Sequence, residues 1–199
     1  FGEIKPPSIP GYNDRELAIL VGLYVGDGWT GKGREHGSLI LGVNDAKASE
    51  IERLLPRISF KRHAARTGVR LVVNDKTLGR FLAENFGEQS LSKTLPLWLL
   101  MSYADFKDAF VSGWDLTDGT RVAHSGVRRI TTASRKLAII GRMLLVSMGY
   151  SVSIRKVETL PLTVIENRIV NQADYYTINR SNCDRYKFTD ERHTWFKVK

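Results

Sequence analysis

The chain has 199 residues, of which 42% are hydrophobic, with a formal net charge of +9 and a pI near 9.8. This composition excludes a disordered chain and predicts a globular protein of one large domain or two small ones. The single cysteine, Cys183, excludes an internal disulfide and a cysteine-rich zinc site. The positive charge favours a polyanionic partner, of which nucleic acid is the commonest and an anionic membrane surface the rival.

The longest apolar runs, at residues 17–25 and 137–148, are too short or too interrupted to cross a bilayer. The first residues have none of the character of a secretory signal, so we expect an intracellular protein, in the cytoplasm or nucleoid of a prokaryotic or phage-infected host. Because the chain begins without Met, we also expect it to be a fragment of a longer product.

Capping residues and apolar periodicity predict the elements in chain order. After a proline-rich lead-in over residues 1–12, we expect helices at residues 14–25, 45–55 and 75–86, and strands at residues 38–43, 58–60 and 69–73. Residues 61–68 are expected to form a basic turn. Further helices are expected from Ser102 or Asp105 to residue 117 and at residues 135–148, and strands at residues 127–131, 151–157 and 175–178. The helix–strand–helix order occurs twice, which predicts a duplicated unit with halves at residues 13–100 and 101–199.

The two helices that end in Asp-Gly carry matching stripes of small residues. Counting back in steps of four from the residue before each Asp gives Gly26, Gly22 and Ala18 in one helix, and Thr117, Gly113 and Ala109 in the other. Residues four apart share a helix face, so two such stripes let two helix backbones approach closely. The same register in both helices favours an interface between them over a chance occurrence of helical glycines, each of which costs up to ~1 kcal/mol.

Paired in this way, the helices would end with Asp27 and Asp118 close together. Two ionised carboxylates at short range repel each other, and a divalent cation such as Mg²⁺ or Mn²⁺ resolves that repulsion. Such a site suits phosphodiester hydrolysis. The alternative is that each Asp only caps local backbone, but a carboxylate at a helix C-terminus opposes the macrodipole.

Several segments of the chain resemble one family. Residues 20–28, Leu-Val-Gly-Leu-Tyr-Val-Gly-Asp-Gly, resemble the LAGLIDADG motif of homing endonucleases, and residues 111–119, Val-Ser-Gly-Trp-Asp-Leu-Thr-Asp-Gly, resemble its second copy. Residues 93–98 are similar to a block between the motifs whose lysine serves the active site, and residues 193–199 to the stretch where an intein returns to its splicing domain. The second motif departs from the family at Asp115-Leu116, where an apolar residue usually precedes Asp.

The resemblance implies an α+β fold built as a pseudo-twofold duplication of αββαββα units. Two antiparallel sheets would form a DNA-binding saddle, with the paired motif helices at its centre. Asp27 and Asp118, with the carbonyls of Gly26 and Thr117, would bind Mg²⁺ or Mn²⁺. Water would then attack both strands of a long, nearly asymmetric DNA target and leave short 3′ overhangs. The chain would act as a monomer.

The resemblance also implies one active-site lysine in each half, for which Lys93 and Lys187 are the candidates, and each could instead be a solvated surface charge. Basic side chains on alternating strand positions would contact DNA, and we expect about half of the following set to do so. The candidates are Arg34, Lys61, Arg62, Arg66, Arg70, Arg121, Arg128, Arg129, Arg155, Lys156 and Arg180.

Other functions stay open on sequence alone. A non-cleaving nucleic-acid binder on the same scaffold, such as an RNA maturase or a regulator, and an inactive endonuclease remnant are the alternatives, although a pure binder has no need of two repelling acids. Protein splicing is not expected of a chain with Phe1 and Lys199 at its ends. The four histidines form no metal-ligand spacing, so a His-metal nuclease is not expected.

Overall fold

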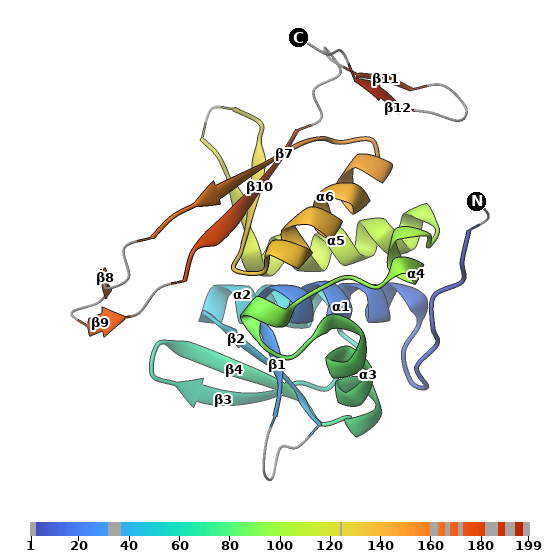
Figure 1. Cartoon of the computed structure of the whole chain (residues 1–199). Helices are drawn as coiled ribbons and strands as arrows, with labels where there is room; N and C mark the ends of the chain where they lie inside the picture. The colour runs from blue at the N-terminus through green and yellow to red at the C-terminus, as the bar shows by residue number, and fades with distance from the viewer. Residues whose placement is uncertain are drawn as a thin grey trace. The chain divides into compact units, whose positions relative to one another are not determined.

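The computed structural model describes residues 3–31, 37–123, 125–159, 163–165, 168–170, 173–181, 187–189 and 194–196 (Figure 1). It divides into two compact units, Phe1–Asp118 and Gly119–Lys199. The first unit ends after the second motif helix because that helix packs on the first. The halves predicted at residues 13–100 and 101–199 describe the repeat in the sequence, and this division stays a prediction.

The first unit has the order αββαββα that the resemblance implies. Its elements are α1 (Asp14–Asp27), β1 (Gly28–Thr30), β2 (Leu39–Val43), α2 (Asp45–Leu54), β3 (Lys61–Ala65), β4 (Gly68–Val73), α3 (Lys76–Phe86), the 3-10 turn η2 (Ser90–Ser92), α4 (Leu97–Leu100) and α5 (Ala104–Asp118). The sheet is antiparallel with strand order β1-β2-β4-β3. Side chains cap the first turns of these helices, Asn13 for α1, Asn44 for α2 and Asp75 for α3.

The prediction of a basic turn over residues 61–68 was wrong. Residues Lys61–Ala65 form strand β3, and the turn is confined to the residues before Gly68, which begins β4 with φ of +133°. No alternating apolar pattern marks β3 because every residue in it is exposed, as expected for a strand at the edge of its sheet. The short strand predicted at residues 58–60 is not present.

The second unit carries the other four-stranded antiparallel sheet. Its elements are β5 (Gly119–Arg121), β6 (Arg128–Thr132), α6 (Arg135–Ser147), β7 (Ser151–Val157), β8 (Thr163–Ile165), β9 (Arg168–Val170), β10 (Tyr175–Ser181), β11 (Lys187–Thr189) and β12 (Thr194–Phe196). The strand order is β5-β6-β10-β7, and α6 packs on β6, β7 and β10 (Figure 1). The excursion between β7 and β10 contains the hairpin β8–β9. After β10, the described residues form the hairpin β11–β12 rather than the helix that would close a second αββαββα unit.

Both sheets therefore agree with the predicted α+β class and its duplicated, antiparallel design. Among the described residues, no helix is long and apolar enough to cross a membrane.

Helices α1 and α5 lie side by side at the core of the first unit, with their backbones in contact (Figure 1). A Cβ built on Gly22 would lie 2.1 Å from the carbonyl oxygen of Phe110, and one built on Gly113 would lie 2.3 Å from that of Ile19. Only glycine leaves room for this approach. The large side chains beside the stripes, including the fully buried Tyr24 and Trp114, complete the core.

Gly22→Ala should destabilise the protein by about 3 kcal/mol or more, at or above the top of the usual cost of overpacking, because the added methyl meets backbone that no rotamer change can move aside. Urea unfolding monitored by circular dichroism measures the loss. Ser112→Ala, on the exposed side of α5, is the control and should change stability by less than about 0.5 kcal/mol. A Gly22→Ala protein as stable as wild type would contradict the close helix contact.

Candidate active site

The ends of the paired helices bring Asp27 and Asp118 together. Both are the last residues of their helices, and both are half-buried. A Cβ built on Gly26 would lie 2.0 Å from the hydroxyl of Thr117 and 3.4 Å from the carboxyl carbon of Asp118. The stripe therefore reaches the end of the helices, and Gly26 keeps the approach close beside the two acids.

Both carboxyl groups have raised pKa values and are therefore harder to ionise than an exposed aspartate. Burial raises the pKa of Asp118 to about 7, and the negative charge of Asp27 adds to that rise. Trp114, Lys47 and Lys93 act in the opposite direction and lower the pKa of Asp118. The pKa of Asp27 is also raised by burial and is lowered in part by the charge of Lys47. The site is thus short of positive charge when both acids are ionised.

Lys93 is fixed at the C-terminal end of α1. Its side chain is 3% exposed, and Nζ donates hydrogen bonds to the carbonyls of Tyr24 (2.8 Å) and Gly28 (3.0 Å) while lying 3.2 Å from the centroid of the Tyr24 ring. These carbonyls carry the negative end of the helix dipole, so an ammonium group is favourable there. Burial lowers the pKa of Lys93 to about 7, and the charges of Asp118 and Glu88 raise it. Lys93 therefore holds the backbone on both sides of Asp27.

Lys47 is a site residue that sequence reasoning missed. It lies in the first turn of α2, and its Nζ donates a 2.6 Å hydrogen bond to the carbonyl of Thr117. A signal was present in the sequence, because a cation in the first turn of a helix opposes the macrodipole in the same way as an acid in the last turn. What the sequence could not show was that α2 comes next to the end of α5.

These residues fit a hard divalent cation. Two carboxylates and backbone carbonyls are the oxygen ligands that Mg²⁺ and Mn²⁺ bind, and the suppressed ionisation of Asp118 is the electrostatic deficit that such a cation corrects. No cluster of three or more His, Cys, Asp or Glu side chains suited to a metal occurs in the part of the chain that the structure describes.

The basic candidates in the first sheet divide between its two faces. Strand register places Lys61 and Arg70 on the face of Gly42, away from α2. Arg62 lies on the opposite face, where it bonds to Ser49 (3.2 Å) and pairs with Glu52 (3.3 Å) of α2. Arg66 is exposed in the turn between β3 and β4.

The face of Lys61 and Arg70 also carries an aromatic residue that the sequence did not single out. Trp29 pairs with Ile40 in the register, is 37% exposed, and extends its ring over Gly42, where an added Cβ would lie 3.2 Å from it. It follows Asp27 by two residues. His63, opposite Arg70 in the register, is exposed on this face as well.

The second sheet shows the same division. Ile130 and Ile178 are buried on the face of the sheet that α6 covers. Arg129 and Arg155 lie on the opposite face. Most of the other residues on that face are polar, and Arg129 bonds to Asn179 at 2.9 Å. Four candidates share the register of Ile130 and Ile178 instead: Arg121, Arg128, Lys156 and Arg180.

The contacts of Arg180 and Lys156 lie within the second unit. Arg180 is 6% exposed, with its guanidinium carbon 4.8 Å from the centroid of the Tyr150 ring. Lys156 pairs with Asp174 at 2.8 Å and with Glu158 at 3.3 Å. Arg34 lies outside the described residues. Lys187 begins strand β11, but its side chain lies outside the described part of the structure.

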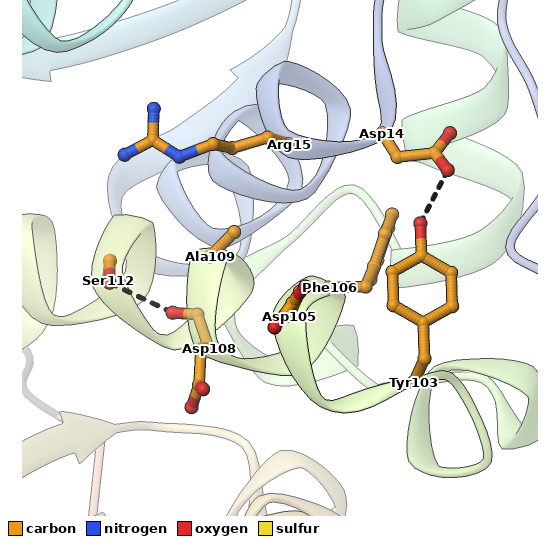
Figure 2. A pocket seen from close by; sticks show the side chains of 8 residues that line it. All are labelled: Asp14, Arg15, Tyr103, Asp105, Phe106, Asp108, Ala109 and Ser112. Atoms are coloured by element: carbon orange, nitrogen blue, oxygen red, sulfur yellow. Dashed lines mark hydrogen bonds between the residues drawn. The ribbon is translucent and has the colours of Figure 1, made fainter.

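The first unit also contains a groove of about 550 Å³ at the other end of the helix pair (Figure 2). Asp14 and Arg15 of α1 and residues of α5 between Asp105 and Ser112 line it, and the Tyr103 hydroxyl donates to the Asp14 carboxylate across it. The carboxylate pair is at the C-terminal ends of the same helices, so this groove is a separate feature.

The solved structures that the chain resembles include LAGLIDADG homing endonucleases. The homing endonuclease I-DmoI in complex with DNA and Mn is 16% identical, with a TM-score of 0.53 over 87% of this chain and 93% of that one. The homing endonuclease I-WcaI bound to its DNA recognition sequence is 13% identical, with a TM-score of 0.51 over 86% and 77%. No protein-family model and no curated protein sequence matches the chain. The chain thus has the fold of the single-chain, two-motif LAGLIDADG endonucleases.

Asp118→Asn should remove a pH dependence of stability in the metal-free protein. Because the pKa of Asp118 in the folded protein is raised to about 7, protonated Asp118 contributes to the free energy of unfolding. This stabilising contribution is fully present below pH ~4 and is lost as the pH rises through ~7. The free energy of unfolding of the variant should therefore exceed that of wild type at pH 8 by on the order of 1–3 kcal/mol, after allowance for solvent screening. At pH 5 the difference should be smaller.

Thermal unfolding in EDTA at the two pH values measures the difference. Mg²⁺ at pH 8 should raise the Tm of wild type and leave that of the variant unchanged. Asp105→Asn, an exposed acid in the first turn of α5, is the control. Equal pH profiles for wild type and Asp118→Asn would contradict the suppressed ionisation of Asp118.

Proposed function

We propose that the protein is a site-specific double-strand DNA endonuclease that requires Mg²⁺ or Mn²⁺ and leaves short 3′ overhangs. The observation that carries this proposal is the pair of half-buried carboxylates at the ends of two helices in backbone contact. The fold holds two acids together although this raises their pKa values and disfavours their ionised forms. A purely structural role does not explain such an arrangement, whereas a catalytic role does. The I-DmoI and I-WcaI structures that share the fold are DNA complexes.

Asp27, Asp118 and the carbonyls of Gly26 and Thr117 would hold the metal. A bound divalent cation supplies Lewis-acid stabilisation of phosphate charge and lowers the pKa of water. Lys93 acts as a positioning residue, because its bonds to the carbonyls of Tyr24 and Gly28 fix the backbone that carries Asp27. Lys187 is proposed as the corresponding lysine of the second half.

The two sheets would bind DNA through the faces that their helices leave free. Lys61, Arg70 and Trp29 lie on the free face of the first sheet, and Arg129 and Arg155 on that of the second. The two faces present different side chains, so a long target with unlike halves is the expected substrate. One chain supplies both motif helices, so the protein would act as a monomer, and it would meet its DNA substrate inside the cell.

An origin within an intein is proposed from the resemblance of residues 193–199 to the stretch where an intein returns to its splicing domain, and sequencing the parent reading frame tests it. The experiments below also test the alternative functions, which are an RNA maturase, a regulator and an inactive endonuclease remnant.

Replacing either carboxylate should abolish cleavage. Wild type incubated with Mg²⁺ and a randomised duplex library should cut one long site, and EDTA should stop the reaction. Loss of a group that only orients a metal ligand costs about 10–100-fold, so Asp27→Asn and Asp118→Asn, which alter proposed direct ligands, should each lower the rate by about 100-fold or more. Asp105→Asn should cut as wild type does.

Sequencing of the cut ends measures the overhang, and filter binding of the same library measures affinity. DNA binding without cleavage by wild type would favour the regulator or the inactive remnant. A preference for RNA over the duplex would favour the maturase.

Neighbouring basic residues on one strand should differ in their effect on DNA binding because they face opposite sides of the sheet. About eight phosphate contacts predict a slope near −7 for log affinity against log salt. Lys61→Ala, Arg129→Ala and Arg155→Ala should weaken binding, each reducing that slope by about 1 where the side chain contacts a phosphate. The matched neighbours Arg62→Ala, Arg128→Ala and Lys156→Ala should leave the slope unchanged.

Fluorescence anisotropy with a labelled duplex at several salt concentrations measures both quantities. A slope near zero for wild type would contradict DNA binding altogether. Equal losses within each neighbouring pair would contradict the assignment of the binding faces.

A further inference from the structure

The ammonium group of Lys47 binds an oxygen that the proposed metal also needs. Thr117 is the next-to-last residue of α5, so its carbonyl is one of the four that a helix leaves without an intrahelical partner. Lys47 Nζ donates to this carbonyl at 2.6 Å. The charge of Lys47 also acts on both Asp27 and Asp118. One side chain therefore interacts with three of the four groups proposed as metal ligands.

Lys47 and Lys93 differ in how firmly they are held. Lys93 is buried, with two carbonyls and the face of Tyr24 around its Nζ. Lys47 is partly exposed at the start of α2. A lysine has a flexible stem and a strongly hydrated head, so a partly exposed one can withdraw into water at little cost. Of the two, Lys47 is the cation that can leave the site.

We propose that Lys47 is a competitor of the divalent metal, which enters the site only when Nζ leaves the Thr117 carbonyl. The inference rests on the metal-dependent function proposed above and assigns Lys47 the control of metal entry. An ammonium group and a divalent cation seek the same oxygens, and their like charges exclude them from one small site. In the DNA-free protein Lys47 partly neutralises the two acids and so weakens metal binding.

A DNA phosphate would offer the ammonium group of Lys47 an alternative hydrogen-bond acceptor. A phosphate is a better acceptor for an ammonium group than a backbone carbonyl because it carries a full negative charge. An incoming phosphate would therefore draw Nζ from Thr117 and free the carbonyl for the metal. Metal loading would follow DNA binding, so that the protein without DNA holds its metal weakly.

Manganese titration of the full chain without DNA tests the competition. Lys47→Met keeps the length of the side chain and removes its charge, and it should bind Mn²⁺ about tenfold more tightly than wild type by isothermal titration calorimetry. Lys47→Arg keeps the charge and should stay close to wild type. Lys76→Met, which removes an exposed lysine from the first turn of α3, is the matched control and should also match wild type.

Circular dichroism and Tm confirm that each variant is folded before titration. Tighter Mn²⁺ binding in Lys47→Met alone supports the inference. Unchanged or weaker binding in Lys47→Met overturns it, and the proposed metal site then still stands if wild type binds Mn²⁺ and Asp118→Asn does not. If neither wild type nor Lys47→Met binds Mn²⁺, the proposed metal-dependent function fails and the inference fails with it.

Discussion

The backbone contact between α1 and α5 is the constraint on which the candidate site depends. Gly22 and Gly113 each lie where a Cβ would collide with the carbonyl of the other helix. Helices separated by ordinary side chains pack with axes about 8–10 Å apart, and glycine contacts permit a closer approach. Because the helices run in the same direction and end at the same level, the residues that follow the glycines are brought together as well.

Charge compensation is the second consequence of that contact. Two acids at the negative ends of two helices form an unfavourable arrangement, and the fold offsets it with two lysines placed in different ways. Lys93 binds the end of α1 and is buried there. Lys47 reaches the end of α5 from α2. The raised pKa of Asp118 indicates that the compensation is incomplete, and this charge deficit is what the proposed metal would correct.

Much of this architecture could be predicted from local sequence. Capping residues such as Asn13 and Asp75, the glycine that follows α3 and the apolar residues of β4 each mark an element through short-range physics. Strand β3 escaped prediction because an exposed edge strand has no core-facing pattern to reveal it. The closing helix expected for the second half does not occur among the described residues, where the hairpin β11–β12 follows β10 instead.

The sequence by itself determined that Asp27 and Asp118 end matching helices and that small residues precede both, because these are periodic features of single segments. Only the tertiary structure decided which basic residues belong to which face. The difference between Lys61 and Arg62 depends on pairing between β3 and β4, and the role of Lys47 depends on where α2 lies against α5. Such relations join residues far apart in the chain, and they exist only once the strands have paired and the helices have packed.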